Sequence, residues 1–243
     1  MKTIFKSLLL SLVTTTFFTS CNEKVEPSKY EGGYYLAVAT VAESEDGKIY
    51  LKEDEGTTLY PTNFQDLTDS VAESIVGKRS WFEYRTFKAE YAEKEYDKTV
   101  ELQSFHPTVT IKPYVTADSI AELSTFGEEL VNIQYAWVTG RYLNLGFEFL
   151  GKDIDKHEFE LVHKKYDNKD GKISLQLCHS ETDNAETARY FIISSFDVSD
   201  FQPTETGKEA TLHISYCTDG STEKTIEIKL KKENGEAKIM KIG

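Results

Sequence analysis

The alternation of apolar and polar side chains between residues 131 and 150 constrains the fold of this chain more than any other feature. Apolar residues occupy the odd positions of Val131–Val138 and again, within Arg141–Leu150, the odd positions from Leu143 to Phe149. A period of two indicates β-strands that bury one face. Thr139-Gly140 between the two segments is typical of a tight hairpin turn. The sequence therefore predicts an antiparallel hairpin that covers a core with one face.

Further strands with the same pattern follow at spacings of about ten residues. They are predicted around Phe159 and Leu161, from Ile173 to Leu177, and over residues 190–198, 210–217 and 225–230. Many short strands, each with one buried and one wet face, are typical of a β-sandwich. We therefore expect an antiparallel β-sandwich domain over residues 107–243.

The preceding part of the chain predicts a second, smaller β-domain over residues 33–106. Tyr34–Val41 is apolar on both faces, as a doubly covered strand would be. Further strands are predicted at 48–52, 57–60, 79–91 and 98–105. Leu67, Val71 and Ile75 recur at a spacing of four, which favours a short helix before the fourth strand. Five strands with one such helix are typical of an OB-like barrel, so the expected fold class is all-β, an OB-like barrel followed by a sandwich.

The first twenty residues have the features of an export signal. Lys2 and Lys6 precede an apolar run, and small residues follow it. The next residue is Cys21, and Phe18–Cys21 resembles the lipobox of bacterial lipoproteins. That resemblance implies cleavage before Cys21 and several acyl chains on it, with residues 21–32 as a tether. The alternative is a simple cleaved signal with an incidental cysteine.

The charge of the mature chain bears on its partners and its location. Without residues 1–20 it has 26 Lys and Arg against 41 Asp and Glu, a net charge of −15. Such a chain repels phosphate backbones, so we expect no nucleic-acid partner. The expected partners are the membrane, through lipid on Cys21, and a glycan or protein. An outer-membrane lipoprotein is expected, and the sequence leaves open whether it faces the periplasm or the cell surface.

Two cysteines remain after the predicted lipidation site. Cys178 and Cys217 each occur late in a predicted strand, on the face opposite the aliphatic residues. An oxidising compartment would permit a disulfide between them. Two free thiols are an equal expectation, because the distance between the strands is not known from the sequence.

Sequence signatures of catalysis and cofactor binding are absent. The chain has no Gly-x-Ser-x-Gly, no P-loop, no dinucleotide-binding glycine motif, no His-Glu-x-x-His and no Cys-x-x-Cys. Ala42–Glu53 and Tyr166–Leu177 imitate calcium loops, but each lacks an end ligand that calcium needs. We therefore expect no catalytic residue, no metal and no cofactor, and a protein that is not an enzyme.

Aromatic residues on the predicted barrel strands are the remaining candidates for a site. Trp81 and Tyr84 lie on one strand, and Tyr50 and Tyr60 on its expected neighbours. OB-like barrels present such side chains for stacking on oligomeric ligands, and a neutral sugar would suit the acidic chain. The competing expectation is that these rings fill the barrel and the contact between the domains.

Taken in order, several segments resemble the NigD-like lipoproteins of the Bacteroides group. The segments are Tyr35–Val41, Gly56–Pro61, Thr116–Ile120, Tyr142–Leu145 and Ser195–Val198. The resemblance covers nearly the whole mature chain and implies an N-terminal OB-like domain and a C-terminal β-sandwich. The family often carries Arg-His-Asn where this chain has Cys178-His179-Ser180, so only the histidine matches. The family name comes from association with a bacteriocin gene cluster.

These observations favour a binding or interaction module of the cell envelope. A hydrolase acting on glycans or peptides is an alternative, and it would need carboxylates from around residues 153–183 to converge in a cleft. A role in bacteriocin immunity or export is a third alternative, implied by the family name alone.

Overall fold

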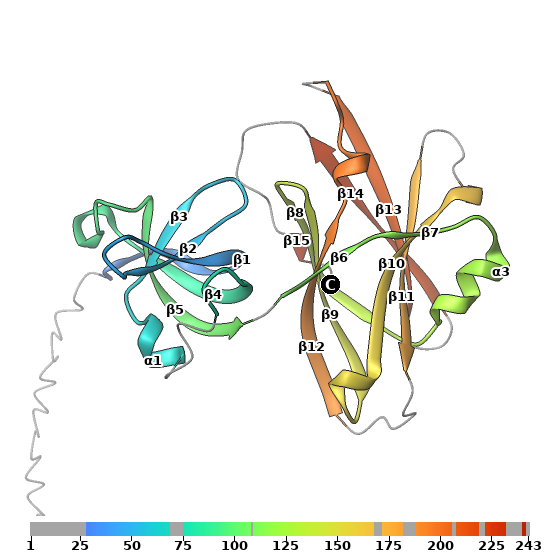
Figure 1. Cartoon of the computed structure of the whole chain (residues 1–243), viewed down its shortest axis with the longest axis horizontal. Coiled ribbons are helices and arrows are strands. Elements are labelled where there is room, and N and C mark those ends of the chain that lie inside the picture. The colour runs from blue at the N-terminus through green and yellow to red at the C-terminus, as the bar shows by residue number, and fades with distance from the viewer. Residues whose placement is uncertain are drawn as a thin grey trace, which may run out of the picture.

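The computed structural model describes residues 28–68, 75–107, 109–167, 172–181, 188–205, 208–218, 222–231 and 240–241. Two β-domains follow one another along the chain (Figure 1). The predicted signal, Cys21 and most of the tether lie outside the described residues. Within the described parts, no helix has both the length and the apolar character that crossing a membrane requires.

The first domain is a closed five-stranded barrel. Its strands are β1 (Tyr30–Glu43), β2 (Ile49–Lys52), β3 (Thr58–Pro61), β4 (Arg79–Phe87) and β5 (Lys98–Pro107), in the order β1-β2-β3-β5-β4. Between β3 and β4 lies α1 (Phe64–Thr68), and η2 (Ala89–Tyr91) follows β4. Leu51, Leu59 and Phe82 are fully buried inside. The predicted OB-like barrel is confirmed. Leu67 of the predicted helix lies in α1, and Val71 lies outside the described residues.

The second domain is a sandwich of two five-stranded sheets. One has the order β14-β13-β11-β10-β7 and the other β15-β8-β9-β12-β6. The strands are β6 (Thr110–Pro113), β7 (Val115–Ala117), β8 (Asn132–Thr139), β9 (Tyr142–Gly151), β10 (His157–Lys164), β11 (Ile173–Glu181), β12 (Ala188–Asp197), β13 (Glu209–Thr218), β14 (Thr222–Lys231) and β15 (Met240–Lys241). Short helices connect them: α3 (Ile120–Leu123), η3 (Ser124–Phe126), η4 (Ile154–Lys156), η5 (Lys165–Asp167) and η6 (Ser199–Phe201). The expected sandwich is confirmed.

The sheets are mixed, whereas the sequence predicted purely antiparallel pairing. β7 pairs with β10, β11 with β13 and β6 with β12 in parallel. The reason is that the chain crosses between the sheets, so that β12 separates β11 from β13. A strand that returns from the opposite sheet can align in either direction, unlike one that follows a tight hairpin.

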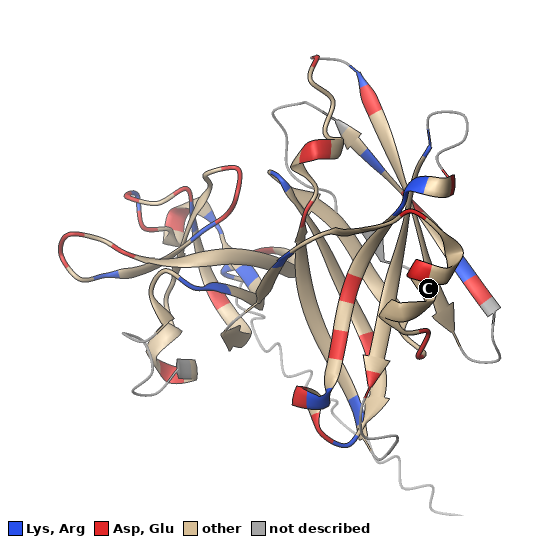
Figure 2. Ribbon diagram, turned by 45° about the vertical axis from the view of Figure 1, so that its right-hand side comes forward, with Lys and Arg blue, Asp and Glu red and all other residues tan. Residues whose placement is uncertain are grey.

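The inner faces of the two sheets form the main core. Phe147 and Leu145 from β9 meet Leu161, Leu175 and Tyr216 from the facing sheet, and all are essentially inaccessible to solvent. Fully burying one such side chain stabilises the fold by about 1.5–3 kcal/mol. Acidic and basic residues are spread along the strands and loops of both domains (Figure 2).

A β-bulge divides strand β8 into two halves that face opposite ways. The register shifts between Ile133 and Tyr135, so Ile133 faces the sandwich core while Tyr135 faces away from it. After the shift it is Ala136 that enters the core, and Trp137 joins a separate apolar cluster. The sequence predicted one unbroken inward face for 131–137. The bulge reverses the second half because one extra residue moves every later side chain to the other face.

The cluster that contains Trp137 is the contact between the domains. From the barrel come Leu36, Val38 and Trp81, and from the sandwich come Tyr135, Trp137, Phe191 and Ile193. The ring of Trp81 stacks on His106 at 3.8 Å and meets Phe191 edge-on at 5.5 Å. The reversed half of β8 thus provides the apolar surface on which the barrel sits.

Polar residues complete the contact around Arg79. The Arg79 guanidinium binds both carboxylate oxygens of Asp54, at 2.6 and 2.7 Å, within the barrel. It also donates to Asn144 Oδ1 at 3.1 Å and to Ser195 Oγ at 3.0 Å in the sandwich. Thr139 Oγ1 donates to Asp54 and accepts from Asn144 Nδ2. The two domains therefore share one buried hydrogen-bonded network.

Candidate functional site

A pocket of about 580 Å³ opens at the end of the sandwich where β9 and β11 finish. It is lined by Glu129, Leu130, Val131, Asn132, Glu148, Phe149, Leu150, His179, Glu181, Arg189, Thr218 and Lys224. These residues come from both sheets and from the segment that leads into β8. The volume lies within the range of pockets that hold small molecules.

The segment before β8 is hydrogen-bonded to the facing sheet and forms one wall. The Glu129 N–H donates to the carbonyl of His179 at 3.0 Å, and the Val131 N–H donates to that of Cys217 at 2.9 Å. Gly127, with φ of 91°, lets this segment approach β11. A Cβ there would lie 2.7 Å from Ser180 Cβ and closer still to the His179 carbonyl oxygen.

The deep part of the pocket is apolar and aromatic. Val131 and Phe149 are buried there. The Phe149 ring is 4.8 Å from Phe159, 5.5 Å from Tyr190 and 5.4 Å from His179. The partly exposed Leu150 lies among the lining residues. A ligand in this pocket would therefore bury apolar surface against a packed wall.

His179 is a buried polar residue of the pocket, as is Thr218. Its Nδ1 lies 3.2 Å from the carbonyl oxygen of Leu130, and its Nε2 lies 2.9 Å from Nδ1 of His157. Since a carbonyl only accepts, Nδ1 of His179 carries a proton and Nε2 accepts from His157. The pKa of His179 is lowered to about 4, chiefly by burial; the hydrogen bond to Leu130 opposes this shift, and the neighbouring His157 adds to it. The imidazole is therefore neutral at neutral pH.

Charged side chains of both signs surround the apolar wall. Arg189 donates to Glu148 Oε2 at 3.0 Å, and Lys224 and Glu129 are exposed among the lining residues. Glu181 is more buried, and its Oε2 lies 3.8 Å from His157 Nδ1. Over the described ranges, no three His, Cys, Asp or Glu side chains gather so as to hold a metal ion. The arrangement suits a ligand with polar ends and an apolar middle.

The two cysteines lie side by side as free thiols, so the structure contains no bridge between them. β11 and β13 are parallel neighbours, and Leu177 pairs with Tyr216 directly before the two cysteines. Neighbouring strands are about 4.8 Å apart, which exceeds the usual Cβ–Cβ distance of about 3.8 Å in a disulfide. Cys178 packs under α3 with Leu123 and Val162, and burial raises its pKa to about 12.

Two of the four aromatic residues that were predicted to stack on a ligand pack against other residues of the protein instead. Trp81 lies in the contact between the domains, and Tyr84 is buried in the barrel core. The competing expectation, that such rings fill the barrel and the domain contact, describes both. Neither ring is available to a ligand, because one face of β4 points into the barrel and the other face packs on the sandwich.

Tyr50 and Tyr60 lie together on the outer face of β2 and β3, where both are half-buried. The expectation that they flank the strand of Trp81 is wrong, because the barrel order makes β1 and β5 the neighbours of β4. Tyr96, from the connection between β4 and β5, stacks on Tyr60 at 5.1 Å and lies 5.6 Å from Tyr50. The chain thus supplies its own ring where a ligand would stack. None of the four predicted residues lines the sandwich-end pocket.

Sequence reasoning missed most of the pocket. Glu129, Glu148 and Lys224 are far apart along the chain and carry no motif. Two signals pointed to it: His179, the one matching position of the family's Arg-His-Asn, and Glu181, which falls in the range 153–183 where the hydrolase alternative needed carboxylates. Strand alternation did place Phe149 on an inward face, but it could not distinguish a pocket wall from ordinary core.

Comparison with known proteins supports the architecture. The chain is similar to a protein of unknown function from Bacteroides vulgatus (20% identity, TM-score 0.61, covering 81% of this chain and 90% of that one). It is also similar to a NigD-like immunity protein from Bacteroides caccae (19% identity, TM-score 0.59, covering 84% and 100%). A candidate lipoprotein from Bacteroides fragilis matches as well (16% identity, TM-score 0.51, covering 84% and 100%). At these identities the likeness concerns the fold.

No curated protein matches the sequence. The model of the NigD-like C-terminal beta sandwich domain matches residues 113–239, which is more than half of the chain and includes every strand of the sandwich from β7 to β14. This match agrees with the resemblance seen in the sequence, and the chain therefore belongs to the NigD-like family.

Proposed function

We propose that this chain is a lipid-anchored protein of the cell envelope that binds a ligand without transforming it. The proposed binding site is the sandwich-end pocket, and the observation that carries the proposal is its composition. A packed aromatic wall lies beside Arg189, Lys224 and three glutamates. Pockets that bind small ligands combine an apolar lining with a few polar groups that fix orientation.

The ligand class follows from this composition. Phe149 and Val131 offer apolar contact, while charges of both signs at the rim can pair with either a cationic or an anionic end. A short peptide segment or a charged glycan has such polar ends. Without residues 1–20 the net charge is −15, which disfavours polyanions such as nucleic acid.

Anchoring through Cys21 is supported by the export signal, by the lipobox-like Phe18–Cys21 and by the candidate lipoprotein of Bacteroides fragilis. The expected location is the outer membrane. Metabolic labelling with an alkyne-bearing palmitate is expected to label the wild type and not Cys21→Ala. Surface proteolysis of intact cells then separates the two orientations, because a surface-exposed chain is degraded and a periplasm-facing chain is protected.

The binding site is tested by narrowing the pocket. Leu150 lines the pocket and is 41% exposed, so Leu150→Trp adds bulk at the rim without disturbing the core. Leu67→Trp is a matched control, since Leu67 is 39% exposed on α1 of the barrel. Arrays of envelope-derived peptides and glycans serve as probes, read by fluorescence polarisation. Binding that Leu150→Trp abolishes and Leu67→Trp preserves is expected. Equal binding by both variants would refute this pocket as the site.

A role in bacteriocin immunity is the second candidate. It is supported by the family name and by the relative from Bacteroides caccae that is described as an immunity protein. Here the ligand would be a segment of the toxin. A deletion strain with unchanged bacteriocin sensitivity and output would remove this candidate.

A hydrolase is the third candidate, because Glu129, Glu148 and Glu181 all line the pocket. A glycosidase needs two carboxyl groups roughly 5–10 Å apart. Turnover of a glycan or peptide by the purified chain that Glu181→Gln abolishes would establish it and overturn the proposal of binding alone.

A further inference from the structure

A group of aromatic and cationic side chains, four of them exposed and four half-buried, lies where β1 begins. We call it the β1 patch, and it consists of Lys29, Tyr30, Tyr34, Tyr35, Arg85, Phe87, Lys88 and Tyr91. Tyr34, Tyr35 and Tyr91 are 57%, 47% and 51% exposed and are among the most exposed large apolar side chains described. Scattered exposed aromatics are ordinary, but a contiguous group indicates an interaction surface.

The patch is built by an irregularity in β1. The register with β4 shifts between Glu31 and Tyr35, so Gly32, Gly33 and Tyr34 bulge out of the ladder. Lys88 N–H donates to the Lys29 carbonyl at 2.9 Å, and Tyr91 N–H donates to that of Lys88 at 2.8 Å, which ties η2 to the bulge. Bulges of this kind commonly present side chains for function.

Cations and rings interleave within the patch. The Arg85 guanidinium lies 3.8 Å from the Tyr30 ring and 5.0 Å from the Tyr34 ring. The Lys29 ammonium lies about equally close to Tyr30 and Phe87, at 5.0 and 4.9 Å. These contacts are cation–π interactions, in which the quadrupole of each ring attracts the neighbouring positive charge.

The patch is electrically balanced in an otherwise acidic chain. Three cations, Lys29, Arg85 and Lys88, and three carboxylates, Glu31, Glu90 and Glu101, belong to β1, β4, β5 and the residues next to them. Glu101 accepts from Tyr30 and Arg85. A net charge of zero here, against −15 for the mature chain, permits approach to a membrane surface that the rest of the protein would avoid.

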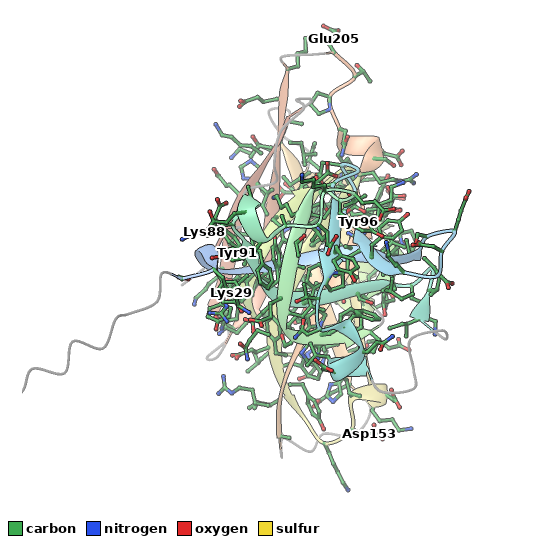
Figure 3. All side chains as sticks on the ribbon, turned by 90° about the vertical axis from the view of Figure 1, so that its left-hand side faces the viewer. Lys29, Lys88, Tyr91, Tyr96, Asp153 and Glu205 are labelled. Carbon is green, nitrogen blue, oxygen red and sulfur yellow. The ribbon has the colours of Figure 1, made fainter. Side chains whose placement is uncertain are left out.

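The position of the patch indicates what covers it. The start of β1 and η2 lie at the end of the barrel away from the sandwich (Figure 1), and Lys29, Lys88 and Tyr91 gather at one edge of that end (Figure 3). Cys21 precedes Lys29 by eight residues, which span at most about 28 Å when extended. A lipid on Cys21 therefore keeps the patch close to the bilayer.

We propose that the β1 patch docks on the lipid headgroups of the membrane that holds the anchor. Tyrosine rings favour the membrane interface, with the ring at the acyl boundary and the hydroxyl in water, and Lys29 and Lys88 can reach phosphates beside them. The inference rests on the proposed anchor at Cys21. Docking would hold the barrel against the bilayer and place the sandwich, with its pocket, on the far side of the barrel.

Tryptophan reporters test the docking without relying on cellular lipidation. The mature chain with Cys217→Ser is coupled through Cys21 to a maleimide-bearing lipid in phosphatidylcholine–phosphatidylglycerol vesicles, and buried Cys178 is spared. Brominated lipids in the bilayer quench tryptophan on contact. Tyr34→Trp and Tyr91→Trp are compared with Tyr166→Trp, a matched exposed tyrosine in η5 of the sandwich.

Selective quenching and a blue shift at positions 34 and 91, with none at 166, are the expected result. Equal behaviour of all three reporters on floating vesicles would overturn the docking while leaving the anchor intact. A signal at position 34 that depends on protein concentration without vesicles would overturn it too, and would assign the patch to a second copy of the chain. Palmitate labelling reports on the anchor separately.

Discussion

The guanidinium of Arg79, in the barrel, donates a hydrogen bond of 3.0 Å to the hydroxyl of Ser195, in the sandwich. The two residues are 116 positions apart in the chain. The Arg79 side chain is only 3% exposed, and that of its ion-pair partner Asp54 is 11% exposed. A buried charge pair that also bonds across the domain contact fixes one relative orientation of barrel and sandwich, because any other orientation would leave these groups without partners.

Removing the cation should therefore destabilise the protein strongly. Arg79→Ala leaves the Asp54 carboxylate buried without its counterion, and such losses cost about 3–5 kcal/mol. We expect a lower midpoint in urea unfolding and a broader distance distribution between the domains in small-angle scattering.

Arg189→Ala is the matched control for this prediction. Arg189 forms an ion pair with Glu148 at 3.0 Å, but its side chain is largely exposed. An exposed pair contributes at most about 1 kcal/mol. Similar losses in the two variants would contradict the role assigned to Arg79.

The stability of the fold should depend on pH through His179. Its pKa is about 4 in the folded chain and about 6.5 in an ordinary environment, so between these values the unfolded chain binds a proton that the folded chain does not. Stability is therefore complete above pH 6.5 and falls as the pH decreases toward 4, by no more than about 3 kcal/mol.

Urea unfolding at pH 7, 6, 5 and 4 measures this dependence. The glutamine of His179→Gln can still donate to the Leu130 carbonyl and accept from His157, but it does not titrate. In this variant the free energy of unfolding should therefore change little between pH 6.5 and 4. Asp197 contributes a second decrease in the free energy of unfolding, because the hydrogen bond from Arg141 lowers its pKa from 3.8 to about 2. This second decrease begins only below about pH 4, and it should remain in His179→Gln. If the free energy of unfolding of His179→Gln decreased between pH 6.5 and 4 as steeply as that of the wild type, His179 would not be the source of the pH dependence.

Gly127 should tolerate no side chain. Its φ of 91° disfavours any L-residue, and a Cβ would also press on the backbone of His179 and on Ser180 Cβ. Gly127→Ala should cost at least about 3 kcal/mol, since strain and overpacking add. Gly56→Ala carries similar strain, with φ of 97° but open space around it, and should cost about 1–2 kcal/mol. Thermal unfolding compares the two, and equal losses would mean that the contact with β11 is unimportant.

The two thiols should react at different rates. Cys217 is partly exposed, whereas Cys178 is buried and its pKa is raised to about 12. Because the thiolate is the reactive form, iodoacetamide at pH 8 should modify Cys217 slowly and leave Cys178 intact in the folded protein. Both should react in urea, as mass spectrometry of the chain with Cys21→Ala can follow. Protection of both thiols until a reductant is added would indicate a disulfide instead.

The strands themselves could be predicted from the sequence. The alternation in Arg141–Leu150 and the turn at Thr139-Gly140 correspond to β9 and to the turn before it, where Gly140 has φ of 52°. The two-domain all-β architecture followed from the same kind of evidence. These features are local, because the period of burial along a strand and the φ that a turn requires are set by neighbouring residues.

The direction in which each strand face points, and the strand with which it pairs, could not be predicted from the sequence. The bulge before Tyr135 turns Trp137 toward the barrel, and no local signal distinguishes this from an unbroken inward face. The partners of Arg79 and the convergence of Glu129, Phe149 and His179 in one pocket depend on strand order and parallel pairing. Each of these contacts joins segments far apart in the chain, so its free energy appears only after the sheets have packed. Local residue patterns are therefore enough to predict the strands and turns. The sandwich-end pocket forms only when the two sheets pack together.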